Sequence, residues 1–365
     1  MDHAVVEGVF PGAVLAVRRG GEQLWLVPAG RLSPDQSGSV VEKTTIYDLA
    51  SLTKPLAVVT SLVLLVQRGR CRIDGPIMSI LPELEDAAIG SATLQQLLTH
   101  SSGLPGWRGF YEILSPNAVL PSTREERSCV NGQVLQLIKQ EALVYQRGEG
   151  SLYSDLGFIL LGMAIERLSG MGLDQFVREH VILPMKAAPL CYLPTEQDGA
   201  SGAVVSKELI APTEWDPWRN RLLCGEVHDD NAAALGGVAG HAGLFGTAEA
   251  VLAVTGEWLS AYHQQPSTLD SGLIREFTQR RHDVPGSSWV FGWDTPSPAS
   301  SSGKHFSHHS FGHLGYTGTS VWIDPVCELE VVLLSNRVCP TRKNERIRAF
   351  RPFIHDLVYQ ECVGC

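Results

Sequence analysis

Features that would mark a membrane, nucleic-acid-binding or secreted protein are missing from this sequence. The 365 residues hold no stretch of about 18 uninterrupted apolar residues, and the mean hydropathy is +0.02, so we expect no membrane partner. No run rich in lysine and arginine is present, and the net charge of −10 disfavours nucleic acid and anionic lipid. Residues 1–10 lack the basic start and long apolar run of a signal peptide, so we expect a cytoplasmic protein.

Cysteine and histidine are present but are not arranged as a metal site. The eight cysteines are scattered along the chain, which favours reduced thiols over a disulfide framework. One C-x-x-C pair, Cys362 and Cys365, stands at the C-terminus without a second pair, so we assign it no redox or metal role. Four histidines lie close together, at His305, His308, His309 and His313, but no carboxylate has a supporting spacing. We therefore expect neither a metal nor a cofactor.

Both ends of the chain predict strands. Residues 12–17 and 23–27 are apolar runs separated by a glycine-containing turn, which predicts a hairpin. Residues 320–323 and 328–334 flank Asp324-Pro325 and predict a second hairpin. Apolar residues at helical spacing over 344–359 predict a terminal helix.

The middle of the chain is mainly helical by the same criteria. Amphipathic or apolar stretches predict helices over 52–67, 93–99, 134–142, 156–168 and 173–180. The segment 285–310 is rich in serine, proline and glycine and predicts an irregular loop. We expect an α+β fold, in which an antiparallel sheet from both chain ends is flanked by helices and carries an inserted, mainly helical domain. The expected sheet domain comprises 1–62 and 232–365, the helical domain comprises 63–231, and the active site lies at their seam.

The first motif with chemical meaning is Ser51-Leu52-Thr53-Lys54. Ser51 precedes a long apolar helix, so it lies near free backbone N–H groups and the positive end of the macrodipole. Lys54 follows three residues later, which places it on the same helical face. Taken alone, Ser-x-x-Lys is more often an N-capping serine beside a solvated lysine.

Three further segments change that interpretation. They are Leu97-Leu98-Thr99-His100-Ser101-Ser102-Gly103-Leu104-Pro105, the stretch from Tyr153-Ser154-Asp155 to Gly162, and Gly312-His313-Leu314-Gly315-Tyr316-Thr317-Gly318-Thr319. With these segments in this order, and with the glycine-rich stretch 235–245, the sequence resembles the β-lactamase-related serine hydrolase superfamily. Its class C-like branch also holds D-Ala-D-Ala peptidases and family VIII carboxylesterases. The resemblance implies a β-lactamase/transpeptidase-like fold.

The resemblance assigns site residues motif by motif. Its Ser-x-x-Lys element falls on Ser51 and Lys54, and its Tyr-x-Asn element falls on Tyr153 and Asp155. Its Lys-Thr-Gly element falls on His313, Leu314 and Gly315. Asp155 and His313 depart from the residues of penicillin-active members, and related esterases are similar in using Asp and His there. These departures disfavour penicillin recognition.

A serine hydroxyl needs a neighbour to take its proton, and Lys54 and Tyr153 are the candidates. A buried Lys54 could lose its own proton, or a charged Lys54 could favour a Tyr153 phenolate, and the sequence leaves both open. The resemblance implies an oxyanion hole from the backbone N–H groups of Ser51 and Tyr316. It also places His313 beside the substrate, as a donor or a positive charge, while Asp155 could bind Lys54 by a charge-assisted hydrogen bond.

Each of these residues also has a plain structural interpretation. Tyr153 could be a packed loop aromatic, Asp155 a first-turn acid favoured by the helix dipole, and His313 a histidine at the edge of a strand. The loop His228-Asp229-Asp230 borders the cleft by resemblance, but it also fits an ordinary polar turn. Four aromatic residues of the middle segment could line an acyl pocket or pack the helices: Trp107, Tyr111, Trp215 and Trp218.

We therefore expect a serine hydrolase that cleaves a small ester or amide through an acyl-enzyme on Ser51, with a small-molecule ester, amide or peptide as its substrate. One alternative is a D-alanyl-D-alanine carboxypeptidase or a β-lactamase. Another, of a different class, is a binding or sensor module that is acylated without turning over.

Overall fold

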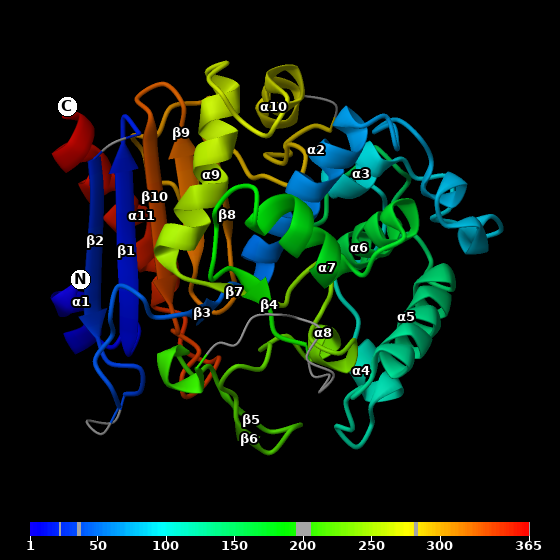
Figure 1. The fold of residues 1–365 in the computed structure, drawn as a ribbon, viewed down its shortest axis with the longest axis horizontal. Helices are drawn as coiled ribbons and strands as arrows, with labels where there is room; N and C mark the ends of the chain where they lie inside the picture. The colour runs from blue at the N-terminus through cyan, green and yellow to red at the C-terminus, as the bar shows by residue number, and fades with distance from the viewer. Residues whose placement is uncertain (22, 35–37, 195–205, 281–283, 365) are drawn as a thin grey trace.

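A five-stranded antiparallel sheet built from both ends of the chain forms one side of the protein (Figure 1). The computed structural model describes residues 1–365 except 22, 35–37, 195–205, 281–283 and 365. In order across the sheet, the strands are β2 (Gln23–Gly30), β1 (Gly12–Arg19), β10 (Leu329–Ser335), β9 (Ser320–Asp324) and β8 (Phe311–Leu314). Both predicted hairpins are present, and pairing of β1 with β10 joins the two chain ends in the middle of the sheet.

Helices cover both faces of this sheet. Along β1, Val14 and Ala16 point into the larger apolar core, whereas Leu15 and Val17 point into a smaller cluster on the other face. α9 (Ala248–Tyr262) packs against β1 and β10 on the first face, and α11 (Ile347–Val363) covers the second, near α1 (Asp2–Val6) (Figure 1). Because both faces are covered at the central strands β1 and β10, these two appear in the sequence as nearly continuous apolar runs.

The middle of the chain forms a mainly helical region beside the sheet (Figure 1). Its helices are α2 (Thr60–Gln67), α3 (Leu94–Leu98), α4 (Phe110–Leu114), α5 (Arg124–Lys139), α6 (Asp155–Ser169), α7 (Leu173–Val177) and α8 (Asp230–Ala234), with α10 (Ser271–Thr278) following α9. Short strands form a three-stranded sheet and a separate pair: β3 (Tyr47–Asp48), β7 (Leu244–Gly246) and β4 (Cys191–Tyr192), then β5 (Trp215–Asp216) with β6 (Arg221–Leu222). The α+β architecture predicted from the sequence is confirmed.

The predicted division into two domains stays a prediction. One apolar core contains residues from β1, such as Val14, and from α6, such as Leu160, so it extends across the predicted boundary. The two regions are thus packed together through side chains, and the seam between them is a buried contact.

The apolar helix after Ser51 is less regular than the sequence predicts. It begins as a 3₁₀ turn, Ala50–Leu52, continues as a π-helical turn, Lys54–Val59, and becomes α-helical only in α2. Pro55 has no N–H to donate, which disfavours regular α-helical bonding at this point. The stretch Ala50–Gln67 is apolar enough by composition to cross a membrane, but 83% of it is buried inside the protein, as in a core helix.

Two other boundaries bear on the sequence predictions. The helix predicted over 134–142 is α5, which begins ten residues earlier because Thr123 caps it and its first half is polar and exposed. The segment 285–310 holds no helix and no strand longer than an isolated bridge, as predicted. The seven described cysteines form no disulfide with one another, and Cys365 of the C-x-x-C pair lies outside the described residues.

Candidate active site

Ser51 lies in a tight turn between β3 and the buried helix that follows. The buried carboxylate of Asp48 accepts hydrogen bonds from the backbone N–H of Ala50 at 2.8 Å and of His228 at 2.6 Å. Ala50 has φ +48°, a left-handed conformation that costs a non-glycine residue about 1 kcal/mol. The turn is therefore fixed by a buried carboxylate, and it presents Ser51 to a pocket.

Lys54 is completely buried one turn after Ser51. Its Nζ donates to Ser51 Oγ at 2.9 Å, to Asp155 Oδ1 at 2.6 Å and to the carbonyl oxygen of His241 at 3.2 Å. Three acceptors match the three hydrogens of an ammonium group. Burial acts to lower the pKa of Lys54, but Asp155 and then Tyr153 outweigh burial and hold this pKa above its usual 10.5. Lys54 is therefore a cation.

Tyr153 stands in the loop before α6, where Lys54 and Ser51 lie close enough to its hydroxyl to affect the pKa of the phenol. The Lys54 Nζ atom lies 4.6 Å from the centre of the Tyr153 ring. Burial raises the pKa of the phenol above its usual 10.0, and the neighbouring Lys54 opposes that effect in part. Ser154 fixes the loop, since its hydroxyl donates to the carbonyl oxygen of Pro105 at 2.8 Å. The structure thus brings together the hydroxyl, the amine and the phenol that the motifs single out.

These groups open onto a pocket of about 330 Å³. Ser51, Tyr153 and Asp155 lie in its wall together with aromatic and acidic side chains. The other lining residues are Ala50, Trp107, His228, Asp229, Asp230, Ala242, Tyr316 and Arg342. The nucleophile candidate is therefore accessible, whereas the lysine beside it is sealed from solvent.

The chain after β8 closes against the Ser51 turn. Thr319 Oγ1 donates to the carbonyl oxygen of Leu49 at 3.0 Å. A Cβ atom on Gly315 would lie only 2.6 Å from that same carbonyl oxygen, so only glycine permits this close approach. The approach brings Tyr316 into the same pocket wall as Ser51, and the oxyanion-hole role that the resemblance implies for both backbone N–H groups stays a prediction.

A model of the family described as Beta-lactamase matches residues 1–351. The chain belongs to the beta-lactamase family. Curated relatives align over most of its length. An N-acetylmuramyl-L-alanine amidase of Bacillus subtilis is 28% identical over 350 residues, covering 90% of this chain and 77% of the relative. A putative D-alanyl-D-alanine carboxypeptidase of Escherichia coli is 29% identical over 309 residues, covering 80% and 69%.

Solved structures show the same fold at lower identity. SurE with D-Leu has a TM-score of 0.72 at 21% identity and covers 99% of this chain and 73% of its own. EstCE1, a hydrolase with promiscuous acyltransferase activity, has a TM-score of 0.71 at 19% identity, with 96% of both chains covered. A class C beta-lactamase from Rhodobacter sphaeroides has a TM-score of 0.68 at 17% identity, with 97% of both covered. The predicted fold and the enzyme class, a serine hydrolase of the beta-lactamase family, are confirmed.

His313 is the predicted site residue whose surroundings differ most from the prediction. It lies on β8, 1% exposed, and its Nδ1 donates to the carbonyl oxygen of Leu314 at 2.7 Å, which leaves Nε2 as an acceptor. Burial lowers the pKa of His313 to about 3, so the imidazole is neutral. It packs against Tyr153 and Trp289 and does not line the pocket. Of the two roles that the resemblance implies for His313, a donor or a positive charge, desolvation disfavours the positive charge, and an action of His313 on the substrate stays a prediction.

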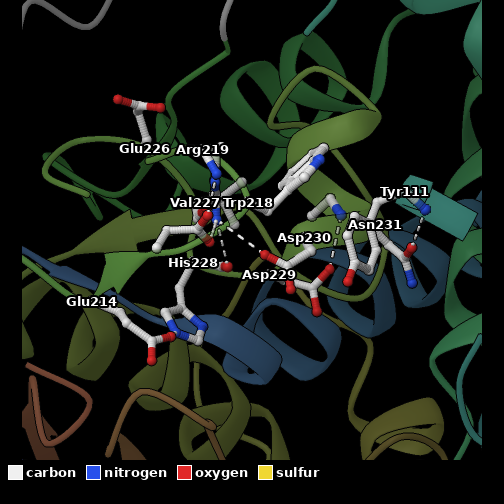
Figure 2. A network of polar contacts seen from close by, with 12 residues as sticks. Tyr111, Glu214, Trp218, Arg219, Glu226, Val227, His228, Asp229, Asp230 and Asn231 are labelled. Carbon is white, nitrogen blue, oxygen red and sulfur yellow. Dashed lines mark hydrogen bonds and ion pairs between the residues drawn. The ribbon is translucent and has the colours of Figure 1, made fainter. Parts of the chain in front are cut away.

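The loop at His228, Asp229 and Asp230 is both a polar turn and part of the pocket wall (Figure 2). The His228 Nε2 atom lies 2.9 Å from Glu214 Oε2, and Arg219 donates to Asp230 Oδ1 at 3.3 Å. Asp229 caps α8. Burial and the neighbouring acids raise the pKa of Asp230 to about 6, against the lowering effect of two arginines. Both interpretations left open by the sequence therefore apply to this loop.

The pocket is also lined by residues that were not among the predicted site residues. Arg342 lines the pocket and is ion-paired with Glu214 and Asp230, but it belongs to a loop after β10 that carries no recognisable motif. Among the four aromatic residues left open by the sequence, Trp107 lines the pocket, whereas Tyr111 and Trp218 pack against each other with ring centres 4.8 Å apart. Within the described residues, no three histidine, cysteine, aspartate or glutamate side chains converge to hold a metal ion.

Proposed function

We propose that this member of the beta-lactamase family hydrolyses a small ester or amide through an acyl-enzyme on Ser51. The observation that carries the proposal is the convergence of the Ser51 hydroxyl, the Lys54 ammonium and the Tyr153 phenol. Removing a charged group from water costs several kcal/mol unless it is paired and hydrogen-bonded. Lys54 has these partners, and one of them is the nucleophile itself.

In this proposal Tyr153 is the general base. The three hydrogens of the Lys54 ammonium are donated to three acceptors, so Lys54 has no lone pair for the Ser51 proton. The reactive form of the site contains a Tyr153 phenolate, which Lys54 stabilises by its charge. Ser51 Oγ then forms a bond with the substrate carbonyl carbon while its proton moves to the phenolate oxygen.

The remaining steps use the backbone of the two segments that meet at the pocket. The negative charge on the substrate oxygen would be held by the N–H groups of Ser51 and Tyr316, where one such donor is commonly worth about 3 kcal/mol. Tyr153 passes its proton to the leaving oxygen or nitrogen as the carbon–oxygen or carbon–nitrogen bond breaks. A water molecule next attacks the acyl carbon, gives its proton to Tyr153, and the acid leaves as the proton returns to Ser51.

The charges at the pocket favour a substrate without a carboxylate next to the scissile bond. Position 313 carries a neutral, buried imidazole where penicillin-active members have a lysine. Arg342, which lines the pocket, is already paired with three carboxylates, those of Glu214, Asp216 and Asp230. A carboxylate in the pocket would therefore meet Asp155, Asp229 and Asp230 without a free cation among the described lining residues.

A second candidate is cleavage of cell-wall peptides by an amidase or D-alanyl-D-alanine carboxypeptidase. Two relatives with such names align over 90% and 80% of this chain. This candidate shares the acyl-enzyme on Ser51 and differs only in the substrate.

The test is covalent trapping followed by turnover. A fluorophosphonate should add one equivalent of mass to the wild type and to Ser79→Ala, which alters an exposed serine outside the pocket, but none to Ser51→Ala. Hydrolysis of p-nitrophenyl acetate and butyrate should show the same dependence on Ser51. Labelling or turnover that survives Ser51→Ala would refute the proposal.

Three further substrates separate the alternatives. Release of D-alanine from a D-alanyl-D-alanine peptide, faster than ester hydrolysis, would favour the second candidate. Rapid hydrolysis of nitrocefin would reveal a β-lactamase. A β-lactam adduct that persists for hours, without turnover of any ester, would point to a sensor.

A further inference from the structure

The segment from Leu97 to Pro105 is one of the sequence motifs, but the proposed mechanism assigns it no role. It contains the buried residue His100, which packs against Tyr153, is 1% exposed and has φ +54°. A left-handed backbone is uncommon for residues other than glycine, although histidine and asparagine tolerate it better than most. The conformation marks a place where the surroundings hold the backbone against its own preference.

His100 holds the chain on both sides of Tyr153. Its carbonyl oxygen accepts the backbone N–H of Leu152 at 2.9 Å, and its ring Nδ1 accepts the backbone N–H of Ser154 at 3.1 Å. Tyr145 adds a third bond, from its hydroxyl to the same carbonyl oxygen at 2.8 Å. The residues immediately before and after Tyr153 are thus attached to a single histidine.

The His100 ring also packs directly on the phenol. Its centre lies 4.6 Å from the Tyr153 ring and 4.7 Å from the Trp289 ring, and the Tyr153 and Trp289 rings are 5.3 Å apart. Phe158 packs on the histidine at 5.3 Å. The phenol therefore lies in an aromatic enclosure, next to the Lys54 ammonium and in the same pocket wall as Ser51.

The hydrogen bond to Ser154 fixes the protonation of this histidine. Because Nδ1 accepts, the ring hydrogen is on Nε2. That N–H is buried and finds no hydrogen-bond partner among the described residues. Burial, and then Lys54 and His313, lower the pKa of His100 well below 6.5, so the ring stays neutral and Nδ1 remains an acceptor.

We infer that His100 is a positioning residue, which holds the Tyr153 phenol in place beside Ser51 and Lys54. The inference rests on the proposed role of Tyr153 as the base. His100 acts through two features: the Nδ1 acceptor, which fixes the backbone after Tyr153, and the ring, which fixes the plane of the phenol. Displacement of a reacting group by about 1 Å can reduce a rate by about 100-fold.

The experiment is a double-mutant cycle on ester hydrolysis with the variants His100→Phe and Tyr153→Phe. His100→Phe keeps an aromatic ring but removes the acceptor, and we expect kcat to fall by about 10- to 100-fold with KM changed by less than about 3-fold. In the Tyr153→Phe background, we expect His100→Phe to lower kcat by less than about 3-fold further, because the group that it positions is already absent. Equal losses in both backgrounds would overturn the inference.

Two more variants separate positioning from loss of folding. The amide oxygen of asparagine can take the place of Nδ1 and asparagine tolerates positive φ, so His100→Asn should recover most of the kcat that His100→Phe loses. Tyr145→Phe removes a hydrogen bond to the same loop without touching the phenol ring, and it should lower Tm with less effect on kcat than His100→Phe has. If His100→Phe does not fold, His100→Gln, whose amide lies one carbon further out, replaces it.

The outcomes also distinguish the inference from the proposed function. If Tyr153→Phe alone leaves kcat unchanged, Tyr153 is not the base and the inference about His100 falls with that assignment, whereas the acyl-enzyme on Ser51 falls only if Ser51→Ala keeps labelling or turnover. If Tyr153→Phe is slow but His100→Asn is as slow as His100→Phe, the proposed function stands and the acceptor role of His100 is refuted.

Discussion

Replacing Asp155 by asparagine tests the charge state on which the proposed mechanism depends. Asparagine is the residue that the family pattern has at this position, and it has nearly the same shape as aspartate. The variant removes one negative charge 2.6 Å from the Lys54 ammonium and leaves the Ser51 and His241 acceptors in place. Any effect therefore arises from the charge of the pair.

The magnitude follows from the burial of the pair. Lys54 is 0% exposed and the Asp155 side chain is 17% exposed. Two unit charges at this distance interact by about 6 kcal/mol at an effective dielectric constant of 20, which is an upper limit because asparagine still accepts a hydrogen bond. Removing one partner of a buried pair costs about 3–5 kcal/mol. We expect the free energy of unfolding at pH 7 to fall by about 3 kcal/mol.

Urea unfolding of the wild type and Asp155→Asn measures this loss, with Asp74→Asn as a matched control. Asp74 also pairs with an arginine, Arg72, but both side chains are exposed, so the control should unfold like the wild type. A loss for Asp155→Asn no larger than that of the control would refute the buried ammonium at Lys54.

The same variant gives a second measurement, the dependence of kcat/KM on pH. Asp155 raises the pKa of both Lys54 and Tyr153, so its removal lowers both. The rise of kcat/KM with pH should therefore begin at lower pH in Asp155→Asn than in the wild type. An unchanged profile would mean that neither group limits the rate.

Further predictions follow from neighbouring residues. Burial raises the pKa of Tyr153 above 10.0, the usual value for tyrosine. In the wild type, kcat/KM for an ester should therefore rise with pH through the alkaline range and reach no plateau below pH 10.0. A stopped-flow pH profile with a plateau near pH 7 would contradict this. Gly315→Ala should abolish ester hydrolysis and lower the free energy of unfolding by about 1–3 kcal/mol, since its Cβ would lie 2.0 Å from Thr319 Oγ1; full activity would refute the close approach. Ala50→Gly should raise thermal stability slightly, by up to about 1 kcal/mol, because glycine adopts positive φ without strain, and calorimetry can check the sign.

The sequence predicts those parts of the fold that local rules determine. The hairpins at 12–27 and 320–334 are predicted from apolar runs on either side of turn residues. In the structure these runs include the paired strands β1 and β10. The contact between Ser51 and Lys54 follows from helical spacing alone. The π-helical turn at Lys54–Val59 does not, because such a turn depends on the packing around it as much as on Pro55.

The limits of sequence reasoning at the site have a physical cause. Arg342 and Trp289 belong to loops whose paths are set by tertiary packing, so nothing in their local sequence indicates the pocket or Tyr153. For His313, the sequence gives the position on a strand but not the degree of burial, and burial decides its charge. The motifs thus specified which groups would meet, whereas their protonation depends on surroundings that only the folded chain supplies.

The threonine hydroxyls that bind the Ser51 turn have a consequence for when the pocket is completed. Thr317 and Thr319 bond to carbonyl oxygens of Asp48 and Leu49, residues 269 and 270 positions earlier in the chain. A nascent chain that has emerged from the ribosome only as far as residue 300 would already contain the serine, the lysine and the tyrosine. The part of the pocket wall that contains Gly315 and Tyr316 would not yet be present. The pocket wall beside Ser51 is therefore complete only after the chain has been synthesised past residue 319.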